Sequence, residues 1–152
     1  MASASLSAED LASLRQLVDA YADSVDRRDR GALLALFTDD AEVRVQTEDG
    51  PVEQSWRGEQ IGDLLDTVAG YHRTFHHVGG ALFDLADGGA ATGRAHCLAH
   101  HYDRSRSGPT DLVMMIRYHD RFACDDDGRW RMTSRQVIVD WTELHSAHSV
   151  RR

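Results

Sequence analysis

Apolar side chains recur at helical spacing near the N-terminus and at alternate positions through much of the second half of the chain. Between Ala8 and Arg28 they fall three or four residues apart, which predicts one long amphipathic helix. We expect Gly31 to break this helix and a second, short apolar helix to run from Leu33 to Phe37. The N-terminal segment is therefore predicted to be a helical hairpin.

A β-hairpin and a further helix are predicted next. Residues 41–48 alternate in the manner of a strand, Asp49-Gly50 is typical of a tight turn, and residues 52–56 can return as the partner strand. Residues 61–69 are expected to form a short apolar helix, which the glycine directly after them would close.

From His72 onward the pattern is that of strands. Turn residues at 87–89, 107–109 and 125–128 separate four predicted strands, which would form an antiparallel meander. Helices followed by strands indicate an α+β fold, in which the helices pack on one face of a curved, mostly antiparallel sheet.

The chain contains no linker or internal repeat that would divide it. Its 152 residues suit one compact domain with a hydrophobic core, so we expect a single domain over residues 1–152. Residues 143–152 have little apolar periodicity. We expect them, and residues 1–6, to be flexible ends.

The predicted strand from Ala91 to Asp103 has one face composed almost entirely of small side chains. Small residues on an inward face either allow a helix to pack closely or leave a hollow, and periodicity does not decide between the two. The histidine at the end of this row would line such a hollow. The row consists of Ala91, Gly93, Ala95, Cys97, Ala99 and His101.

Composition and charge exclude several classes of protein. Hydrophobic residues make up 41% and charged residues 28% of the chain, which is ordinary for a soluble, folded protein. The formal net charge of −8 and the scattered basic residues argue against binding to nucleic acid. Two cysteines and an N-terminus without a signal pattern predict a cytoplasmic location, and no apolar run is long enough to span a membrane.

Asp26 and His76 are the candidates for acid/base chemistry. Imidazole titrates near neutral pH, and a carboxylate that orients it can create a proton acceptor. Each residue also has a simpler interpretation: His76 could be a core histidine bonded to a backbone carbonyl, and Asp26 a solvated acid at a helix end. Tyr21 lies about 140° around an ideal helix from Asp26, so periodicity alone does not bring the three together.

No metal or cofactor is expected. On a strand, His96 and His100 would lie roughly 13 Å apart, too far to share one ion. The helical His-Glu-x-x-His pattern, paired Cys-x-x-Cys motifs, the phosphate loop, the dinucleotide fingerprint and Gly-x-Ser-x-Gly are all absent.

The motifs, taken in order, resemble those of the SnoaL-like branch of the nuclear transport factor 2-like superfamily. They are Tyr21-Ala-Asp-Ser-Val-Asp26, the segment Thr-Phe-His-His-Val-Gly-Gly at 74–80, the run from Gly93 to His101, and Asp-Gly-Arg-Trp-Arg-Met at 127–132. The resemblance covers nearly the whole chain and is particularly clear to scytalone dehydratase and related dehydratases. It implies a cone-shaped sheet wrapped around the helices, with a ligand cavity inside.

The resemblance also implies roles for individual residues. In these enzymes an aspartate matching Asp26 orients a histidine matching His76, which takes a proton during elimination. His101 matches a second catalytic histidine, which in the protonated form could donate to a leaving hydroxyl. Tyr21 matches a tyrosine that is paired with the aspartate. The candidate substrate contacts are Arg135, Met115, Cys97 and Val25. Val25 and Met115 replace a tyrosine and an asparagine of scytalone dehydratase, which argues against scytalone itself as the substrate.

The predicted function is that of a cofactor-independent lyase, of the dehydratase type, or an isomerase. It would use Asp26 and His76 for acid/base catalysis on a small cyclic ketone or polyketide-like molecule of secondary metabolism. The alternatives are a non-catalytic small-molecule-binding domain, and an epoxide hydrolase or polyketide cyclase of the same fold. The resemblance further favours a homodimer and allows the C-terminal segment to form a lid over the cavity.

Overall fold

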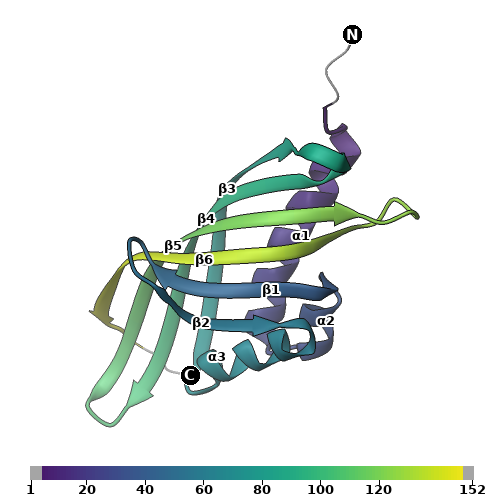
Figure 1. The fold of residues 1–152 in the computed structure, drawn as a ribbon. Coiled ribbons are helices and arrows are strands. Elements are labelled where there is room, and N and C mark those ends of the chain that lie inside the picture. Colours follow the sequence, from purple (N-terminus) through teal and green to yellow (C-terminus); the bar gives the residue numbers. More distant parts are fainter. Residues whose placement is uncertain (1–4, 149–152) are drawn as a thin grey trace.

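The computed structural model describes residues 5–148, and its chain begins with a long helix, α1 (Ala8–Arg27) (Figure 1). Ser7 caps this helix: its hydroxyl accepts a hydrogen bond from the Asp10 amide, and the Asp10 carboxylate accepts one from the Ser7 amide. This reciprocal capping box satisfies amide groups that have no partner inside the helix. The long helix expected from the sequence is therefore confirmed to within one residue.

The second helix differs from the expectation. Arg28, in a left-handed conformation with φ 54°, ends α1, and the side chain of Asp29 then caps α2 (Arg30–Leu34) by accepting from the Ala32 amide at 3.0 Å. Gly31 therefore lies inside α2, and the predicted helix from 33 to 37 was wrong. The cap at Asp29 starts the helix earlier, and backbone pairing with the C-terminal strand draws Phe37 into the sheet.

Two short helical segments and six strands complete the fold. The 3₁₀ segment η1 (Gly58–Leu65) continues into α3 (Asp66–Ala69), where one helix was expected, and the 3₁₀ turn η2 (Asp87–Gly89) connects the third and fourth strands. The strands are β1 (Phe37–Thr47), β2 (Val52–Arg57), β3 (Arg73–Leu85), β4 (Ala91–Ser105), β5 (Gly108–Cys124) and β6 (Trp130–Ser146).

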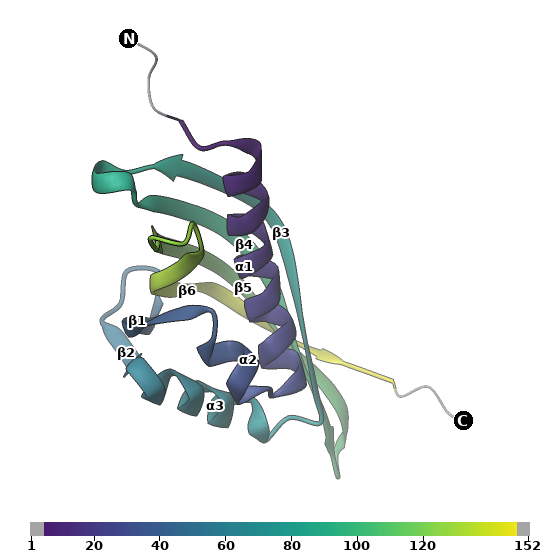
Figure 2. The ribbon, with the colours of Figure 1, turned by 90° about the vertical axis from the view of Figure 1, so that its right-hand side faces the viewer.

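The six strands form one curved, unclosed sheet in the order β2-β1-β6-β5-β4-β3. Strands β1 and β6 are parallel and all other neighbours are antiparallel. Helix α1 lies against one face of the sheet, while α2, η1 and α3 gather near one end of it (Figure 2). The predicted α+β fold with helices on one face of a mostly antiparallel sheet is confirmed.

The face of β4 that carries the small side chains is buried, as the alternating sequence pattern predicts. At one end of the row it permits close packing, because a Cβ on Gly93 would come within 2.9 Å of the Phe122 ring and 3.0 Å of the Phe83 ring. At the other end His101 lines a cavity. Close packing and a hollow, which the sequence left as alternatives, therefore occupy different ends of the same strand.

The C-terminal segment is more regular than expected. Residues 143–146 belong to β6 and pair with β5, where Ser146 lies opposite Thr110, and the Ala147 amide donates to the Pro109 carbonyl at 2.9 Å. A free end was predicted because this segment lacks a buried face, but its backbone is satisfied by the neighbouring strand. Positions 1–4 and 149–152, which the prediction of flexible ends included, lie outside the described residues.

The outer face of the sheet carries a row of apolar side chains. Leu98, Met115 and Trp141 lie side by side on β4, β5 and β6, and Leu98 and Trp141 are exposed. A surface of this kind is compatible with the homodimer expected from the sequence, which stays a prediction. Within residues 5–148, no helix is both long and apolar enough to cross a membrane.

Candidate active site

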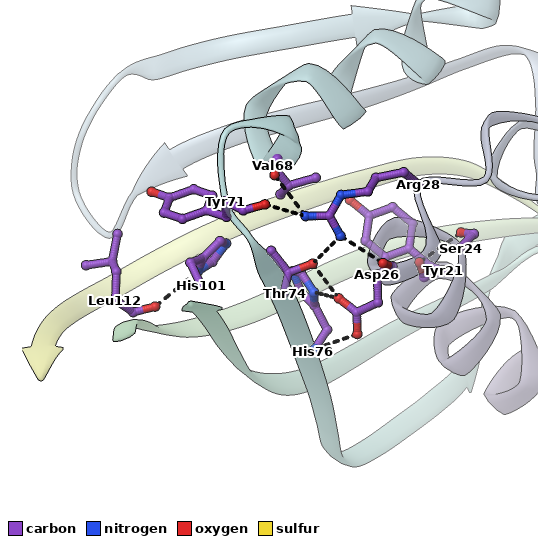
Figure 3. A network of polar contacts seen from close by, with 10 residues as sticks. All are labelled: Tyr21, Ser24, Asp26, Arg28, Val68, Tyr71, Thr74, His76, His101 and Leu112. Carbon is purple, nitrogen blue, oxygen red and sulfur yellow. Dashed lines mark hydrogen bonds and ion pairs between the residues drawn. The ribbon is translucent and has the colours of Figure 1, made fainter. Parts of the chain in front are cut away.

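Asp26 and His76 are in direct contact, although fifty residues separate them in the chain (Figure 3). Asp26 lies in the last turn of α1 and His76 on β3, the strand that packs against this helix. One carboxylate oxygen of Asp26 is 2.7 Å from Nδ1 of His76, and the other accepts the His76 backbone amide at 2.8 Å. The carboxylate thus holds both the ring and the backbone of the histidine.

This contact determines which nitrogen of His76 is available to a ligand. Burial raises the pKa of the Asp26 carboxyl, but hydrogen bonds from the His76 ring and amide and from Thr74 outweigh it, so the net pKa is lowered below the ordinary value of 3.8. An ionised carboxylate can only accept hydrogen bonds, so Nδ1 of His76 carries the hydrogen. In the neutral ring, Nε2 then keeps its lone pair and can accept a proton.

Two further residues, neither of which was predicted from the sequence, support the pair. The buried hydroxyl of Thr74 donates to the Asp26 carboxylate at 2.9 Å. The guanidinium of Arg28 donates to the Asp26 carbonyl at 2.8 Å and makes a longer, 3.4 Å contact with the Thr74 hydroxyl (Figure 3). Thr74 lies within a motif that carries the family resemblance and Arg28 two residues beyond another, but their spacing gives no sign of these contacts.

A cavity of about 370 Å³ lies between the C-terminal half of α1, the α3 region and the sheet. Its wall is mostly apolar, and His76 and His101 are among the polar residues that reach it. Val25, one of the predicted substrate contacts, lines it as well. The two histidine rings are 5.8 Å apart between their centroids and nearly perpendicular. The cavity therefore brings together the two imidazoles that the sequence singled out.

The surroundings of His101 indicate a neutral ring. Its Nδ1 lies 3.1 Å from the Leu112 carbonyl, which can only accept, so this nitrogen carries the hydrogen. Burial lowers the pKa of His101 below its ordinary value of 6.5. Nε2 is then an acceptor, whereas the role expected from the sequence, donation of a proton to a leaving hydroxyl, requires a protonated ring. The geometry favours His101 as an acceptor for a substrate hydroxyl.

The lowered pKa of His101 predicts a loss of stability in mild acid. Below pH 6.5, His101 becomes protonated in the unfolded chain but stays neutral in the folded protein. The free energy of unfolding should therefore fall as the pH drops from 6.5 toward the lowered pKa. Replacing His101 with glutamine should flatten this dependence between about pH 7 and 5. Urea unfolding at pH 7 and at pH 5 measures this dependence, and His119→Gln, at an exposed position, is the control. An equal change in the free energy of unfolding between the two pH values in the wild type and in His101→Gln would contradict the lowered pKa of His101.

Tyr21 is a core residue that also lines the cavity. Its ring packs edge-on against Phe37 and Tyr118, with centroids 6.3 and 5.8 Å away. Burial raises the pKa of the Tyr21 phenol to about 12. The hydroxyl therefore stays protonated and can donate a hydrogen bond.

Arg135 is placed differently from a substrate contact. It is fully buried, forms a two-pronged ion pair with Asp120 at 2.7 and 2.8 Å, and is not among the residues that line the cavity. Its guanidinium lies between two aromatic rings, with Cζ 4.1 Å from the Tyr21 centroid and 3.9 Å from that of Tyr118. This position indicates that Arg135 supports the cavity wall from behind.

Two other predicted substrate contacts also lie outside the cavity lining. Met115 belongs to the outer row of the sheet, and its neighbour Met114, which pairs with Ala99 of the inner face, lines the cavity instead. Adjacent residues on a strand point to opposite faces, so an offset of one position reverses the assignment. Cys97 is buried in the core, and burial raises the pKa of its thiol to about 11, which makes it a poor nucleophile.

Among residues 5–148, no group of three or more histidine, cysteine or acidic side chains is arranged to hold a metal ion.

Solved structures of several proteins share this fold. A hexachlorocyclohexane dehydrochlorinase from Novosphingobium barchaimii superposes with a TM-score of 0.78 at 19% identity, over 95% of this chain and 96% of its own. A protein from Novosphingobium aromaticivorans, provisionally described as a scytalone dehydratase, gives 0.73 at 20% identity, over 93% and 90%. A Mycobacterium tuberculosis protein of unknown function gives 0.70 at 22% identity, over 87% and 72%.

At these identities the structural matches establish the fold, which is the cone of the nuclear transport factor 2-like proteins. None of the curated proteins has a sequence that matches this chain significantly. The model of the SnoaL-like domain family, however, matches residues 6–136, which is most of the chain. Because the match spans both the helices and the sheet that enclose the cavity, the chain belongs to the SnoaL-like domain family.

Proposed function

We propose that this protein is a cofactor-independent lyase or isomerase in which His76 acts as the proton acceptor. The observation that carries the proposal is the 2.7 Å contact between Asp26 and Nδ1 of His76 at the wall of the cavity. It leaves Nε2 as the nitrogen that can meet a ligand. The dehydrochlorinase and the dehydratase-like protein of the same fold support chemistry that begins with removal of a proton.

The proposed substrate is a small, neutral and largely apolar molecule, such as a cyclic ketone or a polyketide-like compound. A volume of about 370 Å³ lies in the range of ordinary small-molecule sites, and the lining is mostly apolar. None of the arginines in residues 5–148 lines the cavity, so a substrate carboxylate or phosphate would have no cationic partner there. The sequence also contains no lysine, which removes catalysis through a Schiff base.

In the proposed mechanism, Nε2 of His76 takes a proton from a carbon next to the substrate carbonyl. The electron pair of the broken C–H bond forms an enolate, whose oxygen can accept a hydrogen bond from the Tyr21 hydroxyl. For isomerisation, the imidazolium returns the proton to another carbon. For elimination, the enolate electrons form the C=C bond and expel the β-hydroxyl, which takes its proton from the imidazolium. Asp26 stabilises the positive charge on His76 during both steps.

Proton exchange tests this proposal with simple ketones in place of the natural substrate. Cyclic ketones and β-hydroxy ketones incubated with the protein in deuterium oxide should gain deuterium at the α-carbon, or lose water, which mass spectrometry detects. Thr142→Trp should abolish the exchange, because Thr142 lines the cavity and is exposed, so a large side chain would block the entrance. Glu143→Trp, the adjacent exposed position on the opposite face of β6, is the matched control.

The outcomes of this experiment separate the rival functions. Ligands that bind to the wild type but are blocked by Thr142→Trp, and that show no exchange or dehydration, would favour a non-catalytic binding domain and contradict the proposal. Hydrolysis of racemic epoxides without ketone exchange would instead indicate an epoxide hydrolase.

A further inference from the structure

The side chain of Arg28 contacts four other residues around the proposed site (Figure 3). One guanidinium nitrogen donates to the Asp26 carbonyl and contacts the Thr74 hydroxyl, at 2.8 and 3.4 Å. The other donates to the carbonyls of Val68 and Tyr71, at 3.0 and 3.3 Å. The side chain thus joins the end of α1, the start of β3, α3 and the segment that follows α3.

The backbone of Arg28 adopts a conformation that normally favours glycine. Its φ of 54° is the only positive value at a non-glycine residue among residues 5–148, and such a residue at the end of a helix is usually glycine, because a side chain there is strained. The left-handed turn itself does not require arginine. The side chain must therefore contribute something that glycine, the conformationally easier residue, would not.

The connections of Arg28 lead to both imidazoles of the cavity. Through Thr74 and the last turn of α1, Arg28 positions Asp26, which holds Nδ1 of His76. Through the carbonyl of Tyr71 it holds the segment whose aromatic ring packs on His101, with centroids 4.8 Å apart. One guanidinium can serve several acceptors in a fixed, planar arrangement, which an ammonium group cannot do.

We infer that Arg28 is a positioning residue for the reaction, and that its guanidinium holds Asp26 and the Tyr71 segment in the geometry that the two histidines require. The inference rests on the proposed function for its effect on rate, but its effect on geometry does not depend on that function. Arg28 itself is not among the residues that line the cavity, so it acts through the groups it binds.

Arg28→Gly is the decisive variant, because it removes the side chain while relieving the backbone. Its melting temperature should stay close to that of the wild type, whereas the ¹⁵N signals of the His76 ring should lose the signature of an Nδ1–H bonded to a carboxylate. On an exchanging ketone, kcat/KM should fall by on the order of 10²-fold, the size of effect that misplacement of catalytic groups produces. Guanidinium ions at low millimolar concentration should restore both the signals and the activity.

Two controls isolate the guanidinium. Arg27→Ala changes the neighbouring exposed arginine, whose ion pairs with Asp23 and Asp29 lie at the surface, and should leave the His76 signals and the rate unchanged. Urea, which has the same shape as guanidinium but no charge, should not rescue Arg28→Gly. Should Arg28→Gly unfold, Arg28→Lys provides the same readouts with the charge retained.

The outcomes are distinguishable. Unchanged His76 signals in Arg28→Gly would overturn the inference, and so would altered signals that guanidinium fails to restore, because the guanidinium would then not be the positioning group. Altered and rescuable signals in a protein whose wild type catalyses no exchange would support the inference while removing the proposed function.

Discussion

Replacing Asp26 with asparagine is expected to lower kcat/KM for ketone exchange by about 10²- to 10⁴-fold, the range over which a general acid/base group contributes. The amide cannot stabilise the imidazolium that forms when His76 takes the proton, and its NH₂ group can hydrogen-bond to Nδ1 and favour the opposite tautomer. Nε2 would then carry the hydrogen and could no longer act as a base. His76→Gln, which removes the base itself, should lose at least as much activity.

This prediction is measured most directly by combining deuterium exchange with ¹⁵N NMR of the histidine side chains. In Asp26→Asn the His76 ring should change its tautomer, while circular dichroism shows an intact fold. Asp23→Asn is the matched control, since Asp23 lies in the same helix with a largely exposed side chain and should leave the rate unaffected. Full exchange activity in Asp26→Asn, with a normal His76 spectrum, would remove the proposed mechanism.

Arg135→Met is expected to cost about 3–5 kcal/mol of the free energy of unfolding. The substitution leaves the Asp120 carboxylate buried and without its partner, and the desolvation cost of that charge is no longer offset. Arg30→Met, which removes an exposed ion pair with Asp63, should cost less than about 1 kcal/mol and serves as the control. Denaturant unfolding of the two variants provides the comparison.

The double variant Arg135→Met with Asp120→Leu should recover most of this loss. A buried ion pair can often be replaced by apolar residues of similar volume at little cost, and one nitrogen of Arg135, Nη1, finds no acceptor among the described residues. Ligand affinity measured in the double variant then tests the role of Arg135. Affinity equal to the wild type would support a structural role; a large loss in a stable double variant would restore Arg135 as a substrate contact.

Several features of this protein follow from its sequence because they depend on local periodicity. Helical spacing predicted α1 to within a residue, and the alternation along β4 correctly placed the small residues and His101 on the buried face. The order of the motifs indicated the SnoaL-like family, which the family match confirms. Asp26 and His76 could also be named as a candidate pair from the sequence, because the family resemblance assigns both residues to one site. Periodicity alone gives no link between two residues that lie fifty positions apart.

The errors arose where one residue changes the outcome. Asp29, rather than Gly31, determined where the second helix begins, because a side-chain cap is available there. Met114, rather than Met115, faces the cavity, because the register of β5 against β4 sets the face of each residue. The pairing of residues 143–146 with β5 depends on residues that lie thirty or more positions away in the chain, which local composition does not report.

The sequence by itself determined the long N-terminal helix, the buried face of β4, the family and the residue types available for acid/base chemistry, because these follow from local spacing and shared motifs. Only the tertiary structure decided that Asp26 reaches His76, that Leu112 holds His101 in its neutral tautomer, and that Asp120 keeps Arg135 out of the cavity. Asp26 and His76 meet only because α1 packs against β3. The other two contacts join residues that lie opposite each other on neighbouring strands, so they depend on how the strands are aligned in the sheet. The distances and the burial of these groups determine their protonation states and the directions of their hydrogen bonds. Both are therefore set only when the chain is folded.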